Sequence, residues 1–147
     1  MAGLFTSDKS TSTARTAILA FSVFTAVNLF SELVGLETFY FASLLLSVWF
    51  FKNGALLTLV SLLILAAMLA SYFLSSRSRK WMLIGLGILC ADAIYITLLL
   101  LGLSSEAGYG RAIFNLLVDL IIHLIAVVFI LVSLFNRKGQ KNNEQKD

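Results

Sequence analysis

Long apolar runs separated by short polar links set the pattern of this chain. Four runs are long enough to cross a bilayer as helices, because about 20 apolar residues rising about 1.5 Å each match a hydrocarbon core of about 30 Å. These runs cover residues 16–34, 55–74, 81–103 and 112–135. The pattern predicts an all-α protein, an integral membrane helical bundle with four transmembrane helices over residues 16–135.

A further apolar run, residues 38–51, fits neither a full span nor a surface helix. Its length corresponds to only about 21 Å of helix, which is short for a span. It carries no charged face, although a helix lying on a membrane surface should have one. Lys52, Asn53 and Gly54 then provide a stop. We expect one short apolar helix here, either re-entrant or a tilted fifth span, and we favour the re-entrant form.

The two ends of the chain are polar. Residues 1–15 form a Ser/Thr-rich leader that we expect to be loosely ordered as far as Thr13, with Ser12 or Thr13 capping the first helix. The first apolar run lacks a small-x-small cleavage site, so we interpret it as an uncleaved anchor. Residues 136–147 form a basic tail.

Composition supports the membrane assignment. The chain of 147 residues is 59% hydrophobic and 13% charged, whereas soluble domains carry about 25% charged residues. A soluble domain of this size could not cover its surface with so few charges. The single cysteine, Cys90, excludes an internal disulfide and the chemistry of paired thiols.

The distribution of cations predicts the orientation. With four spans, only Lys52 and Arg111 lie on one side, and the other Lys and Arg residues lie on the opposite side. Cationic residues collect on the cytoplasmic side, so both termini are predicted to be cytoplasmic. The protein is predicted to lie in the plasma membrane. If residues 38–51 crossed, the N-terminus would be outside and the asymmetry would weaken. Cations beside apolar spans also account for the net charge of +3 without a nucleic-acid partner. The larger set comprises Lys9, Arg15, Arg77, Arg79, Lys80, Arg137, Lys138, Lys141 and Lys146.

Polar residues inside the apolar runs are the candidates for chemistry. Asp92 lies at the midpoint of residues 81–103, at a depth similar to that of His123, and Tyr95 follows it by about one turn. With four spans, Glu32 and Asn28 would line an outer mouth. In the last run, polar residues recur every fourth position and should share one helical face. They are Arg111, Asn115, Asp119 and His123.

These buried groups need partners, because an ionisable side chain at mid-span costs about 2.5–3.5 kcal/mol. Two nearby carboxylates cannot both stay ionised without a counter-charge, so we expect Asp92, Asp119 and His123 to share protons as a coupled set. Three interpretations remain open: an Asp–His hydrogen bond that fixes helix register, a proton or cation site, and a metal site with Asp92 as third ligand. Our prediction includes no metal and no cofactor.

No catalytic or cofactor motif occurs in the sequence. We therefore expect a non-enzymatic membrane subunit or accessory protein that acts through helix–helix contacts in the lipid bilayer, as a homo-oligomer or within a larger membrane complex. The alternative is a small oligomeric channel, or a proton- or cation-coupled transporter, that uses the Asp/His cluster. An intramembrane enzyme is disfavoured because the cluster contains no nucleophile.

Overall fold

Apolar runs without proline favour uninterrupted helices. The computed structural model describes residues 7–36, 42–103 and 109–135, and this part of the chain is almost entirely helical. The fold is therefore all-α, as the hydropathy pattern predicts. The elements are α1 (Ser7–Leu33), α2 (Leu45–Lys52), α3 (Ala55–Leu74), the short 3₁₀ helix η2 (Arg79–Trp81), α4 (Met82–Leu103) and α5 (Gly110–Phe135).

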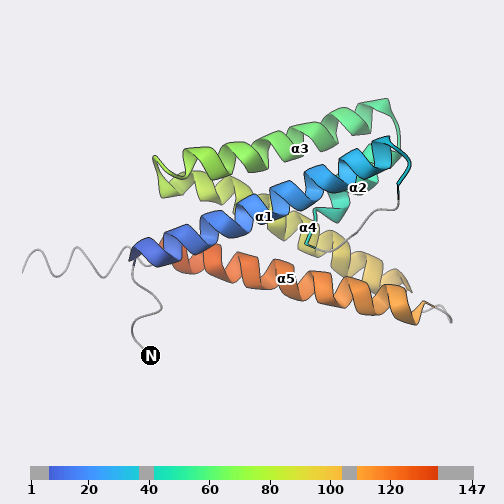
Figure 1. Cartoon of the computed structure of the whole chain (residues 1–147). Helices are drawn as coiled ribbons and strands as arrows, with labels where there is room; N and C mark the ends of the chain where they lie inside the picture. The colour runs from blue at the N-terminus through green and yellow to red at the C-terminus, as the bar shows by residue number, and fades with distance from the viewer. Residues whose placement is uncertain (1–6, 37–41, 104–108, 136–147) are drawn as a thin grey trace, which may run out of the picture.

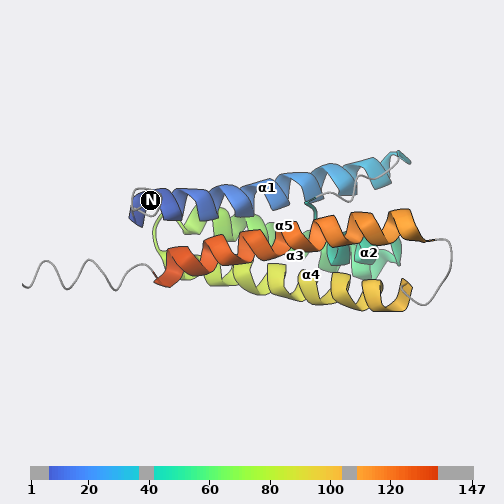
Figure 2. The same ribbon diagram turned by 90° about the horizontal axis from the view of Figure 1, so that it is seen from below.

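Helices α1, α3, α4 and α5 are each long and apolar enough to cross a membrane. They run alternately up and down, so that α1 begins and α5 ends at the same end of the bundle (Figures 1 and 2). Each long helix packs against two others, in the cyclic order α1, α3, α4, α5. This arrangement is the four-helix membrane bundle that the sequence predicts.

Helix α1 begins earlier than expected. Ser12 and Thr13, predicted to be at or before the helix start, lie well inside a helix that begins at Ser7. The Ser and Thr side chains are compatible with helix because their hydroxyls can bond to the carbonyl one turn back, as Thr16 Oγ1 does to Ser12 O at 3.0 Å. Ala14 is fully buried, so this turn is fixed by packing. Residues 1–6 of the predicted leader and all of the basic tail lie outside the described residues.

Helix α2 does not cross the bundle. Its eight residues correspond to about 12 Å, less than half of the hydrocarbon core, so the alternative of a fifth span is wrong. Helix α2 begins beside Asp92, at the middle of α4, and ends at Lys52, which pairs with Glu32 near the end of α1. The helix is shorter than the predicted 38–51: residues 38–41 lie outside the described part, and Ala42–Leu44 form a turn. Helix α2 thus runs from the middle of the bundle back to the end where α1 finishes, as the second half of a re-entrant segment would.

The half of the bundle away from α2 is filled by apolar side chains. Its core includes Ala14, Ile18, Met68, Met82, Leu89, Ala126 and Ile130. Gly85 allows α4 to approach α1 and α3 closely, because a Cβ atom there would lie 3.1 Å from Ile18 Cδ1 and 3.0 Å from Ser71 Oγ. The Ser71 hydroxyl in turn donates to Trp81 O at 2.8 Å and accepts from Gly85 N at 3.2 Å.

This close approach predicts different effects for two glycines on one helix. Gly85→Ala gains about 1 kcal/mol of helix propensity but incurs an overpacking cost of about 1–3 kcal/mol. Gly87→Ala is the matched control, because a Cβ atom there meets nothing within 4 Å. We expect Gly85→Ala to melt below the parent protein in detergent, and Gly87→Ala to melt at or above it. Equal melting temperatures for the two variants would contradict this packing.

Candidate functional site

Asp92 of α4 and His123 of α5 meet in the middle of the bundle. Both side chains are buried, with exposed fractions of 1% and 0%. His123 Nε2 lies 2.8 Å from Asp92 Oδ2, the distance of an ion pair, although its N–H is not aligned on a carboxylate oxygen as in a linear hydrogen bond. The two groups that the sequence places at similar depth therefore face one another instead of lipid.

Asp92 also caps the start of α2. Its Oδ1 accepts the backbone N–H of Leu46 at 2.7 Å, and its Oδ2 accepts that of Leu45 at 3.1 Å. The residue before the helix is Leu44, which offers no capping side chain. Because unbonded N–H groups at a buried helix start are costly, the carboxylate supplied by α4 replaces the missing local cap. It also lies at the positive end of the helix dipole.

Two more side chains bond the turn that precedes α2. Asp119 Oδ1 accepts the N–H of Ala42 at 2.8 Å, and Thr25 Oγ1 accepts the N–H of Leu44 at 2.9 Å. Ala42 adopts a left-handed backbone with φ of 52°, which is unfavourable for a residue with a Cβ atom. Helices α1, α4 and α5 thus each contribute one side chain to the backbone of the re-entrant turn.

His123 is oriented by its own helix and by α1. Its Nδ1 lies 2.9 Å from Asp119 O, and a carbonyl oxygen can only accept, so Nδ1 carries a proton. The Phe21 ring packs against the imidazole edge-on, with centroids 4.5 Å apart. Nε2 faces the Asp92 carboxylate, which already accepts two backbone N–H groups. A proton on Nε2 as well as on Nδ1 would make His123 the cation of an ion pair with Asp92.

The charges of this cluster do not balance. His123 is the single histidine of the sequence and can neutralise one carboxylate, whereas the cluster contains Asp92 and Asp119. Asp119 Oδ1 lies 3.8 Å from His123 Nδ1, farther than a hydrogen bond. Asp119 Oδ2 is buried and has no hydrogen-bond partner among the residues that the structure describes. One carboxylate oxygen is therefore left for a proton or a cation.

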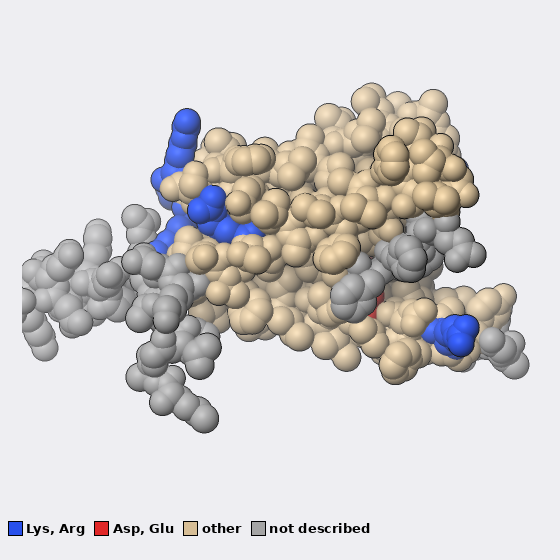
Figure 3. All heavy atoms as spheres, viewed as in Figure 1, with Lys and Arg blue, Asp and Glu red and all other residues tan. Residues whose placement is uncertain are grey.

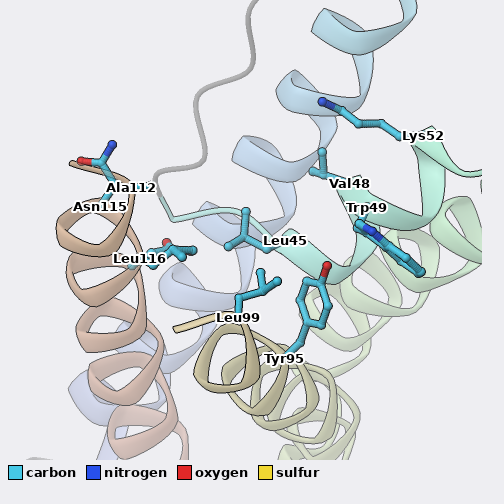
Figure 4. Close-up of a pocket in the computed structure, with 10 residues that line it drawn as sticks. Leu45, Val48, Trp49, Lys52, Tyr95, Leu99, Ala112, Asn115 and Leu116 are labelled. Carbon is cyan, nitrogen blue, oxygen red and sulfur yellow. The ribbon is translucent and has the colours of Figure 1, made fainter. Parts of the chain in front are cut away.

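A cavity of about 460 Å³ lies between α2, α4 and α5 (Figure 4). Asp119, which is 2% exposed, lines its inner end. The cavity exists because α2 packs against α1, α3 and α4 but makes no comparable contact with α5. Lys52 and Ala112, at the α2 and α5 ends, mark its rim. From Ala112 to Asp119 the cavity descends about 10 Å along α5. Its other lining residues are Leu45, Val48, Trp49, Tyr95, Leu99, Asn115 and Leu116.

The structure separates the remaining candidate residues into two groups. Asn115 and Tyr95 line the cavity with Asp119. Asn28 is buried within α1, and Glu32 pairs with Lys52 at 2.6 Å between Oε1 and Nζ, so neither forms the lining described here.

Arg111 is also exposed outside this lining. The expected stripe on α5 therefore does not stay on one face. A four-residue step overshoots a full turn by about 40°, so Arg111 is exposed while His123 is fully buried.

Cations gather at the two ends of the bundle. Figure 3 shows Lys and Arg mainly at the end where α1 begins and a smaller cationic spot toward the opposite end. The surface between them shows no Lys or Arg and one small acidic spot. At the first end, Arg15 packs over the Tyr72 ring at 5.0 Å and Arg79 Nη1 donates to Ser133 O at 3.4 Å. The cavity rim, with Lys52, belongs to the opposite end.

Sequence reasoning missed the role of Thr25 and the backbone partners of the two aspartates. These partners are main-chain N–H groups, which residue types do not reveal. A signal was nevertheless present. The residue immediately before Leu45 is Leu44, which cannot cap a helix, although an apolar helix that starts inside a bilayer needs its first N–H groups bonded. The acceptors therefore had to come from other helices.

The bond from Leu44 to Thr25 predicts a stability difference between two threonines. Thr25→Val keeps the side-chain shape but leaves the Leu44 N–H unsatisfied, which should cost about 1–3 kcal/mol. Thr97→Val is the control, because the Thr97 hydroxyl donates to the Ala93 carbonyl of its own helix at 2.8 Å. Unfolding in mixed detergent should show the loss for Thr25→Val and a much smaller effect for Thr97→Val. Similar losses would contradict the role given to Thr25.

No protein-family model matches this chain, and no curated protein or solved structure is similar to it at a significant level. The function is therefore argued from the geometry of the site.

Proposed function

We propose that this protein is a non-enzymatic, multi-pass membrane protein that takes up and releases a proton or small cation at Asp119, as part of proton- or cation-coupled transport. The observation that carries the proposal is the unpartnered Asp119 Oδ2, buried at the inner end of a cavity that opens toward one end of the bundle. A buried carboxylate oxygen without a donor is costly in an apolar interior, and a proton or cation removes that cost.

The surroundings of Asp119 support exchange at this carboxylate. The titratable or charged groups that face it are His123 on its own helix, Asp92 on α4, and Tyr95 and Lys52 across the cavity. His123 is engaged with Asp92, and Lys52 is engaged with Glu32 of α1. Asp119 is thus the member of the cluster whose charge is least compensated by a described side chain.

Access to Asp119 is one-sided in this structure. The cavity descends from the rim to Asp119, whereas below His123 the bundle is closed by Phe21, Leu89 and Ala126. By the positive-inside rule we place the cation-rich end in the cytoplasm, so that the cavity opens outward and both termini are cytoplasmic. The structure then corresponds to an outward-open state, and transport requires this apolar floor to open.

The competing interpretation is an accessory subunit acting through helix contacts. Small residues on α3, namely Ala66, Ala67, Ala70 and Ser71, would let a partner helix approach closely. Ser71 is already used within the bundle, where it bonds to Trp81 and Gly85. Among the described residues, no group of three or more His, Cys, Asp or Glu side chains is arranged to hold a metal ion. The geometry therefore favours the exchange of a proton or a monovalent cation.

The orientation can be tested by labelling single cysteines. In a Cys90→Ser background, Asn53→Cys places a thiol at the rim end and Ser76→Cys places one at the cation-rich end; both parent side chains are exposed. A membrane-impermeant maleimide added to intact cells should label the first and not the second. Labelling of Ser76→Cys alone would reverse the proposed orientation.

The exchange itself can be tested on purified protein and in proteoliposomes. In infrared difference spectra, lowering the pH should produce the carbonyl band of a protonated carboxyl, and Asp119→Asn should remove this band. In liposomes with an entrapped pH dye and an imposed membrane potential, the parent protein should carry protons, and Asp119→Asn should fall to the level of protein-free liposomes.

Two controls make this experiment decisive. Asp119→Asn retains an amide oxygen that can accept the Ala42 N–H, so it removes the charge without removing the backbone contact. Asp8→Asn changes another acidic residue, in the first turn of α1 at the end of the bundle opposite the cavity rim, and should leave both signals intact. Unchanged proton flux in Asp119→Asn, or no flux in the parent protein, would reject transport and favour the accessory role.

A further inference from the structure

The chemistry of the cavity walls indicates a more specific occupant. We propose that the cavity binds a lipophilic amine, with the ammonium group on Asp119 Oδ2 and the apolar body against the walls above it. This inference rests on the proposed cation exchange at Asp119 and names the substrate class. It concerns a site whose volume, about 460 Å³, lies within the range of small-molecule pockets.

The polar and apolar parts of the cavity are arranged as such a molecule requires. At the inner end, one carboxylate oxygen is buried and unpartnered, which suits a single ammonium group that donates a charge-assisted hydrogen bond. Above it, Leu45, Leu99 and Leu116 form an apolar wall (Figure 4). A hydrated inorganic cation would gain nothing from this wall, whereas an alkyl or aryl body would bury its surface there.

Two aromatic rings complete the wall between α2 and α4. Trp49 and Tyr95 lie with ring centroids 6.1 Å apart, and Figure 4 shows the Tyr95 hydroxyl directed up toward the α2 side. Trp49 is 45% exposed, so its ring is available to an incoming molecule. Aromatic faces attract organic cations and pack against aryl groups. The wall therefore favours an amine that carries a ring or a branched alkyl group.

The rim does not oppose the entry of a cation. Lys52 is the charged residue of the lining at this level, and its Nζ lies 2.6 Å from Glu32 Oε1. The pair is neutral as a unit, so the attraction of Asp119 is not offset by an uncompensated positive charge at the entrance. The Asn115 side chain, also at the mouth, is polar but uncharged and adds no positive charge there.

The test uses Trp49 as the reporter. Trp81→Phe removes the other of the two tryptophans, so the fluorescence of full-length protein in phosphatidylcholine nanodiscs reports on the cavity. The probes are 2-phenylethylamine and its neutral analogue 2-phenylethanol, with empty nanodiscs correcting for partition into lipid. We expect the amine to bind about tenfold or more tightly than the alcohol, as a charge-assisted hydrogen bond implies.

The variants separate charge from volume. Asp119→Asn should abolish the preference for the amine, and Asp8→Asn, in the first turn of α1 at the other end of the bundle, should retain it. Leu99→Phe should weaken the binding of both probes by filling the cavity. Equal affinities of the amine and the alcohol in the parent protein overturn the inference without any variant, and so does an unchanged preference in Asp119→Asn. Proton flux that depends on Asp119 without amine binding would reject the ligand and keep the exchange. Amine binding without flux would reject the transport and keep the ligand site.

Discussion

The hydrogen-bonding requirement of a few backbone N–H groups controls this structure. Helix α2 starts in the middle of an apolar bundle, where the N–H groups of its first turn need acceptors from the protein. The required acceptors come from three other helices: Thr25 on α1, Asp92 on α4 and Asp119 on α5. The two carboxylates thus have a structural role. They lie at mid-depth because the N–H groups that they accept, in α2 and the turn before it, lie there.

This structural role explains why one carboxylate oxygen of the cluster is not used. Asp92 is saturated by two N–H groups and by His123, but Asp119 uses one oxygen for Ala42 and leaves the other unbonded. The same re-entrant segment also creates the cavity, because α2 is too short and too far from α5 to fill the space above Asp119. A structural device and an exchange site can therefore share one carboxyl group, and a stability assay alone would not separate the two roles.

The two halves of the bundle differ accordingly. The half that contains α2 holds the cavity, the buried charges and the Lys52–Glu32 pair. The other half has an apolar core, in which Gly85 allows the helices to approach closely. Any movement that carries a proton or an amine across the membrane has to disturb this second half. Its packing around Phe21 and Leu89, next to the imidazole, closes the bundle on the side of His123 away from the cavity.

The sequence by itself determined the helices that can span a membrane, because their hydropathy and length are local properties that can be compared directly with the thickness of the hydrocarbon core. It also determined that Asp92 and His123 share a depth, since a residue's place along an apolar run fixes its height. Tertiary structure decided which way they face, the limits of α2 and the start of α1 at Ser7. These features depend on how helices rotate and pack against one another, and on main-chain N–H groups that every residue type carries alike, so no pattern of side chains along the chain could reveal them.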